Sequence, residues 1–252
     1  MQKLKAKTKY DCTNSDKCKL NKIKEKENNT MDVLGLDEAG RGPVLGPLVV
    51  AGVVVPEKMI KVLDKMGVKD SKRLTPNRRT VLSRKLTKMF DYEIVEISAR
   101  EIDQLRADGV NLNDIEKLAM KKILKNLKAE EIYIDALDVK EGRLQDEMQE
   151  FVGSQSKVTA EHKADDTYLV VGAASIIAKA RRDEVMEEIN KEYMRTTGDE
   201  DGMGSGYPSD PKTKDFLKKF KYSEMPEFVR RSWATVQKIK DEESNTSLLD
   251  FF

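Results

Sequence analysis

The sequence predicts a mixed α/β fold built on a five-stranded sheet. Two β-branched runs, residues 33–36 and 48–55, flank a loop rich in glycine and proline, so we expect them to pair antiparallel. After a third strand, helical patterns alternate with two more short strands, which is typical of a mixed sheet. With 252 residues, the chain is long enough for one large domain or two small ones.

The remaining elements follow in a regular order. Residues 92–98 alternate as a third strand, residues 132–134 form a short apolar strand ending in Asp135, and residues 157–160 form a fifth. The helix expected at 113–127 has apolar residues at helical spacing, namely Ile115, Leu118, Ala119, Ile123 and Leu127. Further helices are expected at residues 57–65, 76–90, 169–193, 211–220 and 226–240.

The two ends of the chain differ from its centre in composition. Residues 1–30 are rich in Lys and Asn and lack periodicity, so we expect a disordered basic extension. Met31 would itself make a plausible start of translation, so this extension is either a basic arm or an over-extended gene prediction. We expect a main α/β domain over residues 31–208, a helical segment over 209–240 and a flexible acidic tail over 241–252.

The composition excludes several classes of protein. Cys12 and Cys18 are the only cysteines, too few for a four-cysteine zinc site or a disulfide scaffold. His162 is the only histidine, which excludes catalysis by several histidines. There is no apolar run of membrane-spanning length and no secretory signal pattern, so we expect a soluble, cytoplasmic protein. The sequence shows no heptad pattern or long apolar surface that would indicate a dimer, so a monomer is expected.

Four acids stand where predicted strands end or enter loops. Asp37 and Glu38 follow the first strand, Asp135 ends the fourth, and Asp165 follows the fifth. If the first and fourth strands are neighbours, Asp37 and Asp135 project from the same edge of the sheet. Carboxylates suit hard divalent ions, and two such ions about 4 Å apart can activate water and stabilise a leaving oxygen. Taken singly, each acid is better explained as a turn former or a helix cap.

Six motifs occur in the order found in one enzyme family. They are Asp37–Pro43 (DEAGRGP), Asp70–Lys72 (DSK), Tyr133–Ala136 (YIDA), His162–Asp165 (HKAD), Ala173–Lys179 (AASIIAK) and Gly206–Asp210 (GYPSD). Over about residues 31–240, the chain resembles type 2 ribonuclease H, or ribonuclease HII, in its archaeal-like form. The resemblance implies a ribonuclease H-like fold. It also implies an endonuclease that cleaves the RNA strand of RNA–DNA hybrids and nicks duplex DNA 5′ of an embedded ribonucleotide, leaving 3′-hydroxyl and 5′-phosphate ends.

The resemblance also implies the roles of individual residues. Asp37, Glu38, Asp135 and Asp165 match the acids that hold two Mg²⁺ or Mn²⁺ ions. Asp37 would bridge the ions, Asp165 would hold the nucleophile-side ion, and Asp135 with Glu38 would hold the other. Asp166 lies next to Asp165, but the HKAD register favours Asp165 as the ligand.

Other matching residues would contact the substrate. The backbone of Gly40, Arg41 and Gly42 would read the 2′-hydroxyl, and the Tyr207 ring would pack on the adjoining deoxyribose. Without the resemblance, the alternative for these glycines is a tight turn, and ordinary packing within a turn is the better explanation of Tyr207. Further matches to phosphate-contacting positions are Lys72, Ser175 and Lys179. Outside this set, we expect His162 to serve local structure or the substrate rim, and Arg181 and Arg182 to be solvated or ion-paired.

The end of the chain resembles the peptide by which replication and repair enzymes bind the sliding clamp. Asn245, Leu248, Phe251 and Phe252 match its key positions, although glutamine is usual where Asn245 stands. Leu248 and the two phenylalanines have the spacing of one side of a helical turn. The alternative is that this tail folds back on its own domain.

Two other classes of function remain as alternatives. Another nuclease with the same sheet, such as a resolvase or the type 3 enzyme, is disfavoured by the GRG and GYPSDP segments. A non-catalytic nucleic-acid-binding or clamp-binding module is disfavoured because all four acids are present.

Overall fold

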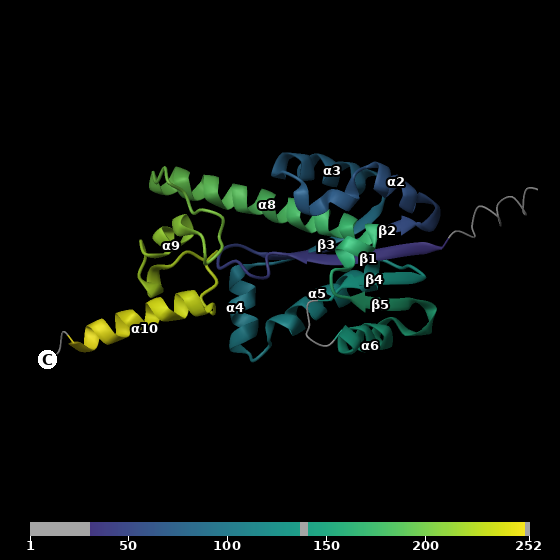
Figure 1. The fold of residues 1–252 in the computed structure, drawn as a ribbon. Helices are drawn as coiled ribbons and strands as arrows, with labels where there is room; N and C mark the ends of the chain where they lie inside the picture. Colours follow the sequence, from purple (N-terminus) through teal and green to yellow (C-terminus); the bar gives the residue numbers. More distant parts are fainter. Residues whose placement is uncertain (1–30, 137–140, 250–252) are drawn as a thin grey trace, which may run out of the picture.

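The structure is a three-layer arrangement of helices on both faces of a central sheet (Figure 1). It is a computed structural model that describes residues 31–136 and 141–249. The basic extension expected at residues 1–30 and the two terminal phenylalanines, Phe251 and Phe252, lie outside the described residues. In the described part of the chain, no helix is long and apolar enough to cross a membrane.

The central sheet has five strands in the order β3-β2-β1-β4-β5. Antiparallel pairing joins β1 to β2 and β2 to β3, whereas β4 pairs parallel with both β1 and β5. The predicted mixed five-stranded sheet and its antiparallel first pair are therefore confirmed. The strands are β1 (Asp32–Ala39), β2 (Leu48–Pro56), β3 (Asp91–Ile97), β4 (Glu131–Asp135) and β5 (Lys157–Glu161).

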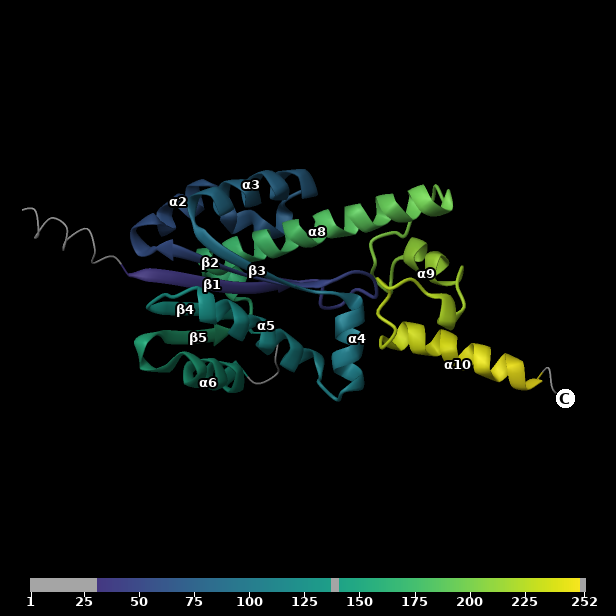
Figure 2. The same ribbon diagram turned by 180° about the vertical axis from the view of Figure 1, so that it is seen from behind.

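Helices cover both faces, as Figures 1 and 2 show from opposite sides. One face carries α2 (Ile60–Lys65), α3 (Pro76–Met89) and α8 (Leu169–Thr197). The other carries α4 (Ala99–Ala107), α5 (Leu112–Asn126) and α6 (Glu141–Val152). The remaining helical elements are η1 (Glu57–Met59), η2 (Val68–Arg73), η3 (Gly153–Gln155), α7 (Ala164–Thr167), α9 (Pro211–Leu217), η4 (Tyr222–Glu224) and α10 (Ala234–Leu249).

Strand β2 shows why the sheet needs two covering layers. Its sequence LVVAGVVVP is apolar at almost every position, and alternate residues of a strand point to opposite faces. Leu48, Val50 and Val54 enter the core beneath α4–α6, whereas Val49 and Val53 enter the core beneath α2, α3 and α8. Both faces of the strand are therefore buried, which a one-sided sheet could not achieve.

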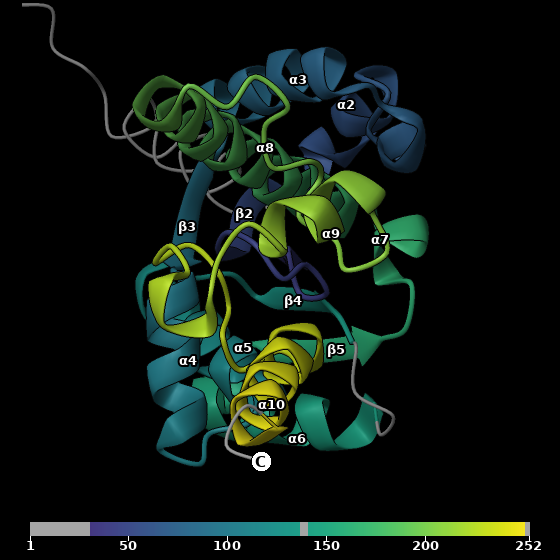
Figure 3. The same cartoon turned by 90° about the vertical axis from the view of Figure 1, so that its left-hand side faces the viewer.

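A third core ties the C-terminal helices to the loop after β1. Val44 and Leu45 of that loop pack with Phe216 of α9 and Val236 of α10. Figure 3 shows α9 and α10 in front of the sheet at this end, and Figure 1 shows that α8 projects beyond the strands toward α9. The C-terminal segment is therefore packed against the loop that follows the first two acids.

The predicted helices at 226–240 and 113–127 need correction. The former begins only at Ala234, and it continues to Leu249, into the segment 241–252 that was expected to be a flexible acidic tail. Backbone hydrogen bonds and a β-bridge join Val229 and Arg230 to the loop after β1, so these residues cannot be helical. In α5, Leu118 is 55% exposed, and Met120 and Leu124 are buried instead. Helices α4 and α6 were not predicted.

Candidate active site

Three of the four predicted acids meet at one edge of the sheet. Leu36 of β1 pairs with Ile134 of the parallel neighbour β4, so Asp37 and Asp135 follow at the same level. Oxygens of Asp37, Asp135 and Asp165 all lie within 4.8 Å of one another. Asp37 and Asp165 are buried, and Asp135 is half-buried. The predicted convergence on this edge is therefore present in the structure for these three residues.

Short backbone contacts hold the acids in place. The Ala164 N–H donates to Asp135 Oδ1 at 2.8 Å, which fastens the start of α7, and with it Asp165, to the end of β4. The residue before it, Lys163, has a φ of 59°, a left-handed conformation that turns the chain from β5 into α7. The Glu38 N–H donates to Asp37 Oδ1 at 2.7 Å.

Glu38 lies apart from this cluster of three. Successive residues of a strand point to opposite faces, so Glu38 projects toward α5. There it lines a small cavity together with Asp135 and Glu116. Its Oε2 atom and the Oε1 atom of Glu116 are buried and have no hydrogen-bond partner among the described residues. Glu38 therefore lies near Asp135 on the face of the sheet that α5 covers.

The acids lie in surroundings that disfavour negative charge. Burial raises the pKa of the Asp37 carboxyl to about 7, although the Ser175 hydroxyl and Lys179 oppose the shift. Burial, followed by the nearby Asp37 and Glu116 carboxylates, raises the pKa of Glu38 well above its usual range. Burial also raises the pKa of Asp135. Clustered, poorly solvated carboxylates with unpartnered oxygens fit a hard divalent cation, which takes oxygen ligands and stabilises their charge.

We expect the metal-free protein to lose stability as the pH rises from about 4 to about 7. Asp37 has a folded-state pKa of about 7 against an ordinary 3.8. Its contribution is therefore complete below the unfolded value and is lost as the pH rises through the folded one, because a buried charge then forms. Thermal unfolding in EDTA across this range should show the loss, and Mg²⁺ should oppose it. Asp37→Asn removes this group, so an equal slope in the variant and the wild type would contradict the prediction.

Three predicted phosphate contacts occupy different positions around the acids. The Lys72 Nζ atom donates to Asp165 at 3.2 Å and to Asp166 at 2.6 Å. The half-buried Lys179 donates to Ser175 Oγ at 2.7 Å. Ser175 itself is fully buried, so the predicted direct phosphate contact does not fit this structure. Ser175 instead links Lys179 to the Asp37 carboxyl.

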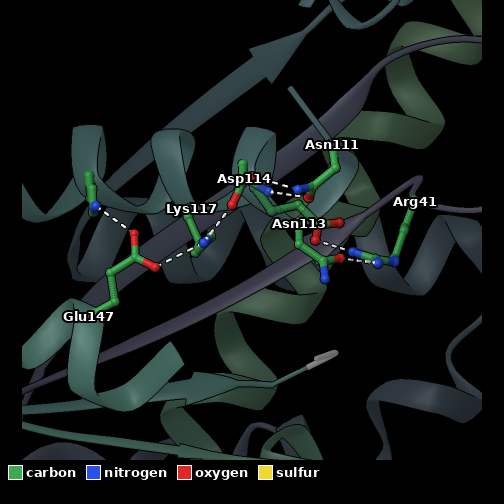
Figure 4. Close-up of polar contacts among 8 residues, drawn as sticks. Arg41, Asn111, Asn113, Asp114, Lys117 and Glu147 are labelled. Atoms are coloured by element: carbon green, nitrogen blue, oxygen red, sulfur yellow. Dashed lines mark hydrogen bonds and ion pairs between the residues drawn. The ribbon is translucent and has the colours of Figure 1, made fainter. Parts of the chain in front are cut away.

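The loop after β1 carries Arg41, whose side chain is turned toward α5. Figure 4 shows its guanidinium directed at Asn113, and it also pairs with the buried Glu116 carboxylate. On the same helix, Lys117 binds Glu147 of α6 at 2.8 Å and so joins the two helices. Because the Arg41 side chain is engaged with α5, the backbone is the part of this loop that remains for recognition.

Tyr207 stands beside that loop and is 45% exposed. A Cβ atom built at Gly42 would lie 3.7 Å from Cε1 of the Tyr207 ring. The Arg182 guanidinium lies 5.9 Å from the ring centroid and donates to the Leu45 carbonyl at 3.3 Å. Arg182 is buried, and it has no carboxylate partner among the described residues. The prediction of a solvated or ion-paired Arg182 is therefore wrong.

Two further predicted side chains have ordinary partners. Arg181 forms ion pairs with Glu96 and Glu184, as expected for a solvated or paired arginine. His162 lies at the surface, and its Nδ1 atom contacts the Ala136 carbonyl, in keeping with a role in local structure.

Several residues around the site were not predicted. Glu116 and Asn113 hold Arg41, while Arg230 and Trp233 contact the carbonyls of the loop after β1. The sequence does indicate Glu116, since it is an acid on the otherwise apolar buried face of α5. Nothing in the sequence indicates Arg230 and Trp233, because they lie about 190 positions from the loop that they contact.

The proposed clamp peptide lies only partly within the described residues. Asn245 is exposed in the last turns of α10, and the backbone of Leu248 also belongs to that helix. Phe251 and Phe252 lie beyond them. The helical backbone at 245–249 agrees with the predicted helical spacing of this peptide.

The chain is similar to several known proteins. The ribonuclease HII family model matches residues 34–236. The ribonuclease HII of Methanobrevibacter smithii is 63% identical over 211 residues, covering 84% of this chain and 99% of that protein. The ribonuclease H2 from Pyrococcus horikoshii OT3 has 40% identity and a TM-score of 0.76, covering 84% of this chain and 98% of that chain.

A further structural neighbour comes from an assembly. The structure of the PCNA:RNase HII complex from Archaeoglobus fulgidus contains a chain that is 41% identical, with a TM-score of 0.72. The match covers 81% of this chain and 95% of that one. These matches confirm the expected ribonuclease H-like fold and the archaeal-like form.

Proposed function

The chain belongs to the ribonuclease HII family of endoribonucleases, and we propose that it hydrolyses the RNA strand of RNA–DNA hybrids and nicks duplex DNA 5′ of embedded ribonucleotides. The observation that carries this proposal is the meeting of Asp37, Asp135 and Asp165 within 4.8 Å. Membership in a family of endoribonucleases leaves the alternative of a non-catalytic binding module without support.

In the proposed reaction, Asp37, Glu38, Asp135 and Asp165 would hold two divalent ions. Asp37 would contribute to both ion sites, Asp165 would serve the side of the attacking water, and Asp135 with Glu38 would serve the side of the leaving oxygen. Bound Mg²⁺ or Mn²⁺, both of which suit oxygen ligands, would activate water and stabilise the 3′-oxygen, leaving 3′-hydroxyl and 5′-phosphate ends. Burial of Asp37 supports this arrangement, because its raised pKa of about 7 leaves the carboxyl only partly ionised near neutral pH, and a bound cation would favour the charged form.

Cations next to the acids suit the negative backbone of the substrate. Lys72, half-exposed beside Asp165, and Lys179, half-buried one turn beyond Ser175, can each approach a phosphate near the acids. We assign Ser175 to the orientation of Lys179 and Asp37 rather than to the phosphate itself. These contacts position the strand and carry no information about its sugar.

Selection of a ribonucleotide falls to the loop and the ring beside it. The backbone of Gly40, Arg41 and Gly42 would read the 2′-hydroxyl, which both donates and accepts hydrogen bonds. The exposed Tyr207 ring would pack on the following deoxyribose and sense the RNA-to-DNA step. Their adjacency supports this division of roles, since Gly42 and the Tyr207 ring are near neighbours.

Tyr207→Ala should separate the two substrates. We expect cleavage at a single ribonucleotide in duplex DNA to fall about 10- to 100-fold, as for the loss of one stacking platform. Cleavage of a long hybrid should change by no more than about threefold. Labelled duplexes of both kinds, cut with Mg²⁺ and with Mn²⁺, measure the ratio.

Tyr92→Ala is the matched control, because Tyr92 is also an exposed tyrosine but lies on β3. It should leave both activities unchanged. An equal loss on both substrates in Tyr207→Ala would contradict the junction role. If the wild type fails to cut 5′ of a single ribonucleotide, the proposed specificity is wrong.

We also propose that the C-terminal peptide binds a sliding clamp, which would bring the enzyme to replicating or repaired DNA. The complex of a relative with PCNA supports this, as do Asn245, Leu248, Phe251 and Phe252. Deletion of residues 245–252 should abolish binding to an archaeal PCNA in surface plasmon resonance and leave cleavage at the wild-type rate. Asn245→Gln should strengthen binding. Undiminished binding by the truncated chain would refute the assignment.

A monomer in the cytoplasm is the proposed working form. The acids, the GRG loop and Tyr207 all come from one chain, so the proposed site is complete within a single copy.

A further inference from the structure

Arg230 is a fully buried arginine directly beneath the loop after β1. Its Nη2 atom donates to the Gly40 carbonyl at 2.6 Å and its Nη1 atom to the Arg41 carbonyl at 3.2 Å. Its Nε atom donates to the Gly46 carbonyl at 2.9 Å. One planar guanidinium therefore holds both ends of the loop, which the single point charge of a lysine could not do at three separate positions.

Trp233 completes this support from the same segment. Its Nε1 atom donates to the Gly42 carbonyl at 3.1 Å, and its ring lies 4.7 Å from the Arg230 guanidinium. Three successive carbonyls, those of Gly40, Arg41 and Gly42, are thus bound by two side chains of the C-terminal segment.

The direction of these carbonyls determines where the loop N–H groups point. In a trans peptide, the C=O and the following N–H point in opposite directions, and no peptide bond of the described residues is cis. Binding of the Gly40 and Arg41 carbonyls by Arg230 therefore turns the Arg41 and Gly42 N–H groups away from Arg230. The third peptide has no N–H, because Pro43 follows.

The outcome is a pair of neighbouring donors on one side of the loop. Gly40 has a φ of +91°, and left-handed residues of this kind let successive N–H groups form a concave site for an oxygen. Within the described residues, neither the Arg41 nor the Gly42 N–H has an acceptor. They are thus free to donate to a substrate oxygen.

We propose that Arg230, assisted by Trp233, is the positioning residue that aims the Arg41 and Gly42 N–H groups at the sugar 2′-oxygen and so determines specificity for ribonucleotides. This inference rests on the proposed reading of the 2′-hydroxyl by the GRG loop. It assigns the geometry of that loop to a side chain about 190 positions away in the sequence.

The test compares Arg230→Lys, Trp233→Phe and wild type for binding, without cleavage. Labelled duplex DNA with one ribonucleotide and the matched all-DNA duplex are titrated in EDTA, and the ratio of their dissociation constants is the readout. Arg230→Lys should lower the preference for the ribonucleotide about tenfold, which corresponds to one or two misplaced hydrogen bonds. The affinity of this variant for the all-DNA duplex should stay within about twofold of the wild-type affinity. Trp233→Phe, which keeps an aromatic ring and loses the N–H donor, should lower this preference about threefold.

Arg79→Lys controls for the loss of a half-buried, ion-paired arginine elsewhere in the fold. Arg79 bridges α3 to Asp183 of α8 and has no contact with the loop, so its variant should lose stability and keep the wild-type ratio. A purely structural role for Arg230 would lower the folded fraction or the melting temperature and leave the ratio unchanged, and this result overturns the proposal. If Arg230→Lys does not fold, an unchanged ratio in Trp233→Phe overturns it instead.

The wild type separates this inference from the proposed function. If the wild type binds both duplexes equally, the loop does not read the 2′-hydroxyl in binding, and this part of the proposed function is refuted. If the wild type prefers the ribonucleotide and Arg230→Lys prefers it equally, only the role of Arg230 is refuted.

Discussion

Asp135→Asn is expected to lower cleavage of a single-ribonucleotide duplex by about 1,000-fold or more while leaving duplex affinity within about threefold. Asn has nearly the shape of Asp, so the contact between the Ala164 N–H and the side-chain oxygen at this position can persist. What is lost is one negative charge in a cluster whose oxygens lie within 4.8 Å. A neutral amide is a weak ligand for a hard divalent ion, so catalysis should fail and binding should not.

Asp166→Asn provides the matched control. Asp166 follows Asp165 directly and also binds Lys72, but its side chain is half-exposed and it is not part of the cluster of three. This variant should cut at a rate within about threefold of wild type. Rates are measured in Mg²⁺ and in Mn²⁺, with affinity measured in EDTA. A comparable loss in both variants would mean that the acidic region acts by general electrostatics and that Asp135 is not a ligand.

Local pattern was sufficient to predict the sheet and the position of the acids. Strand β2 is apolar throughout, β4 ends in Asp135, and β1 carries Asp37 and Glu38 just before its last residue, so the position of the acids could be located before any contact was known. Parallel pairing of β1 with β4 then brings Asp37 and Asp135 to one level. Prediction succeeds where neighbouring residues determine the structure.

The supports of the site could not be predicted because they are long-range. Arg230 and Arg182 look like ordinary surface arginines in a chain with 36% charged residues, yet both are buried beneath one loop. The segment around Val229 has helical periodicity, but pairing with the loop after β1 prevents a helix until Ala234. In each case the deciding contact joins residues far apart in the sequence, which periodicity does not report.

Gly35→Ala is expected to destabilise the fold by at least about 3 kcal/mol. A Cβ atom at Gly35 would lie 2.3 Å from the Val170 carbonyl oxygen and 2.6 Å from the Val171 nitrogen. These are backbone atoms of α8, so no side-chain rotation relieves the clash and the helix must move away from β1. Chemical denaturation should show a lower free energy of unfolding, and activity should fall as well, because α8 carries Ser175 and Lys179 beside Asp37.

Gly142→Ala separates this packing effect from a general intolerance of glycine replacement. Gly142 lies in α6, its added Cβ would meet no atom within 4 Å, and alanine favours a helix by about 0.5–1 kcal/mol over glycine. The control variant should therefore be as stable as the wild type or more stable. Full stability in Gly35→Ala would mean that α8 does not approach β1 this closely, and the placement of Ser175 and Lys179 next to Asp37 would then have to be revised. A loss confined to Gly35→Ala would show that the absence of a side chain at this position of β1 lets α8 pack closely enough to place Ser175 and Lys179 beside Asp37.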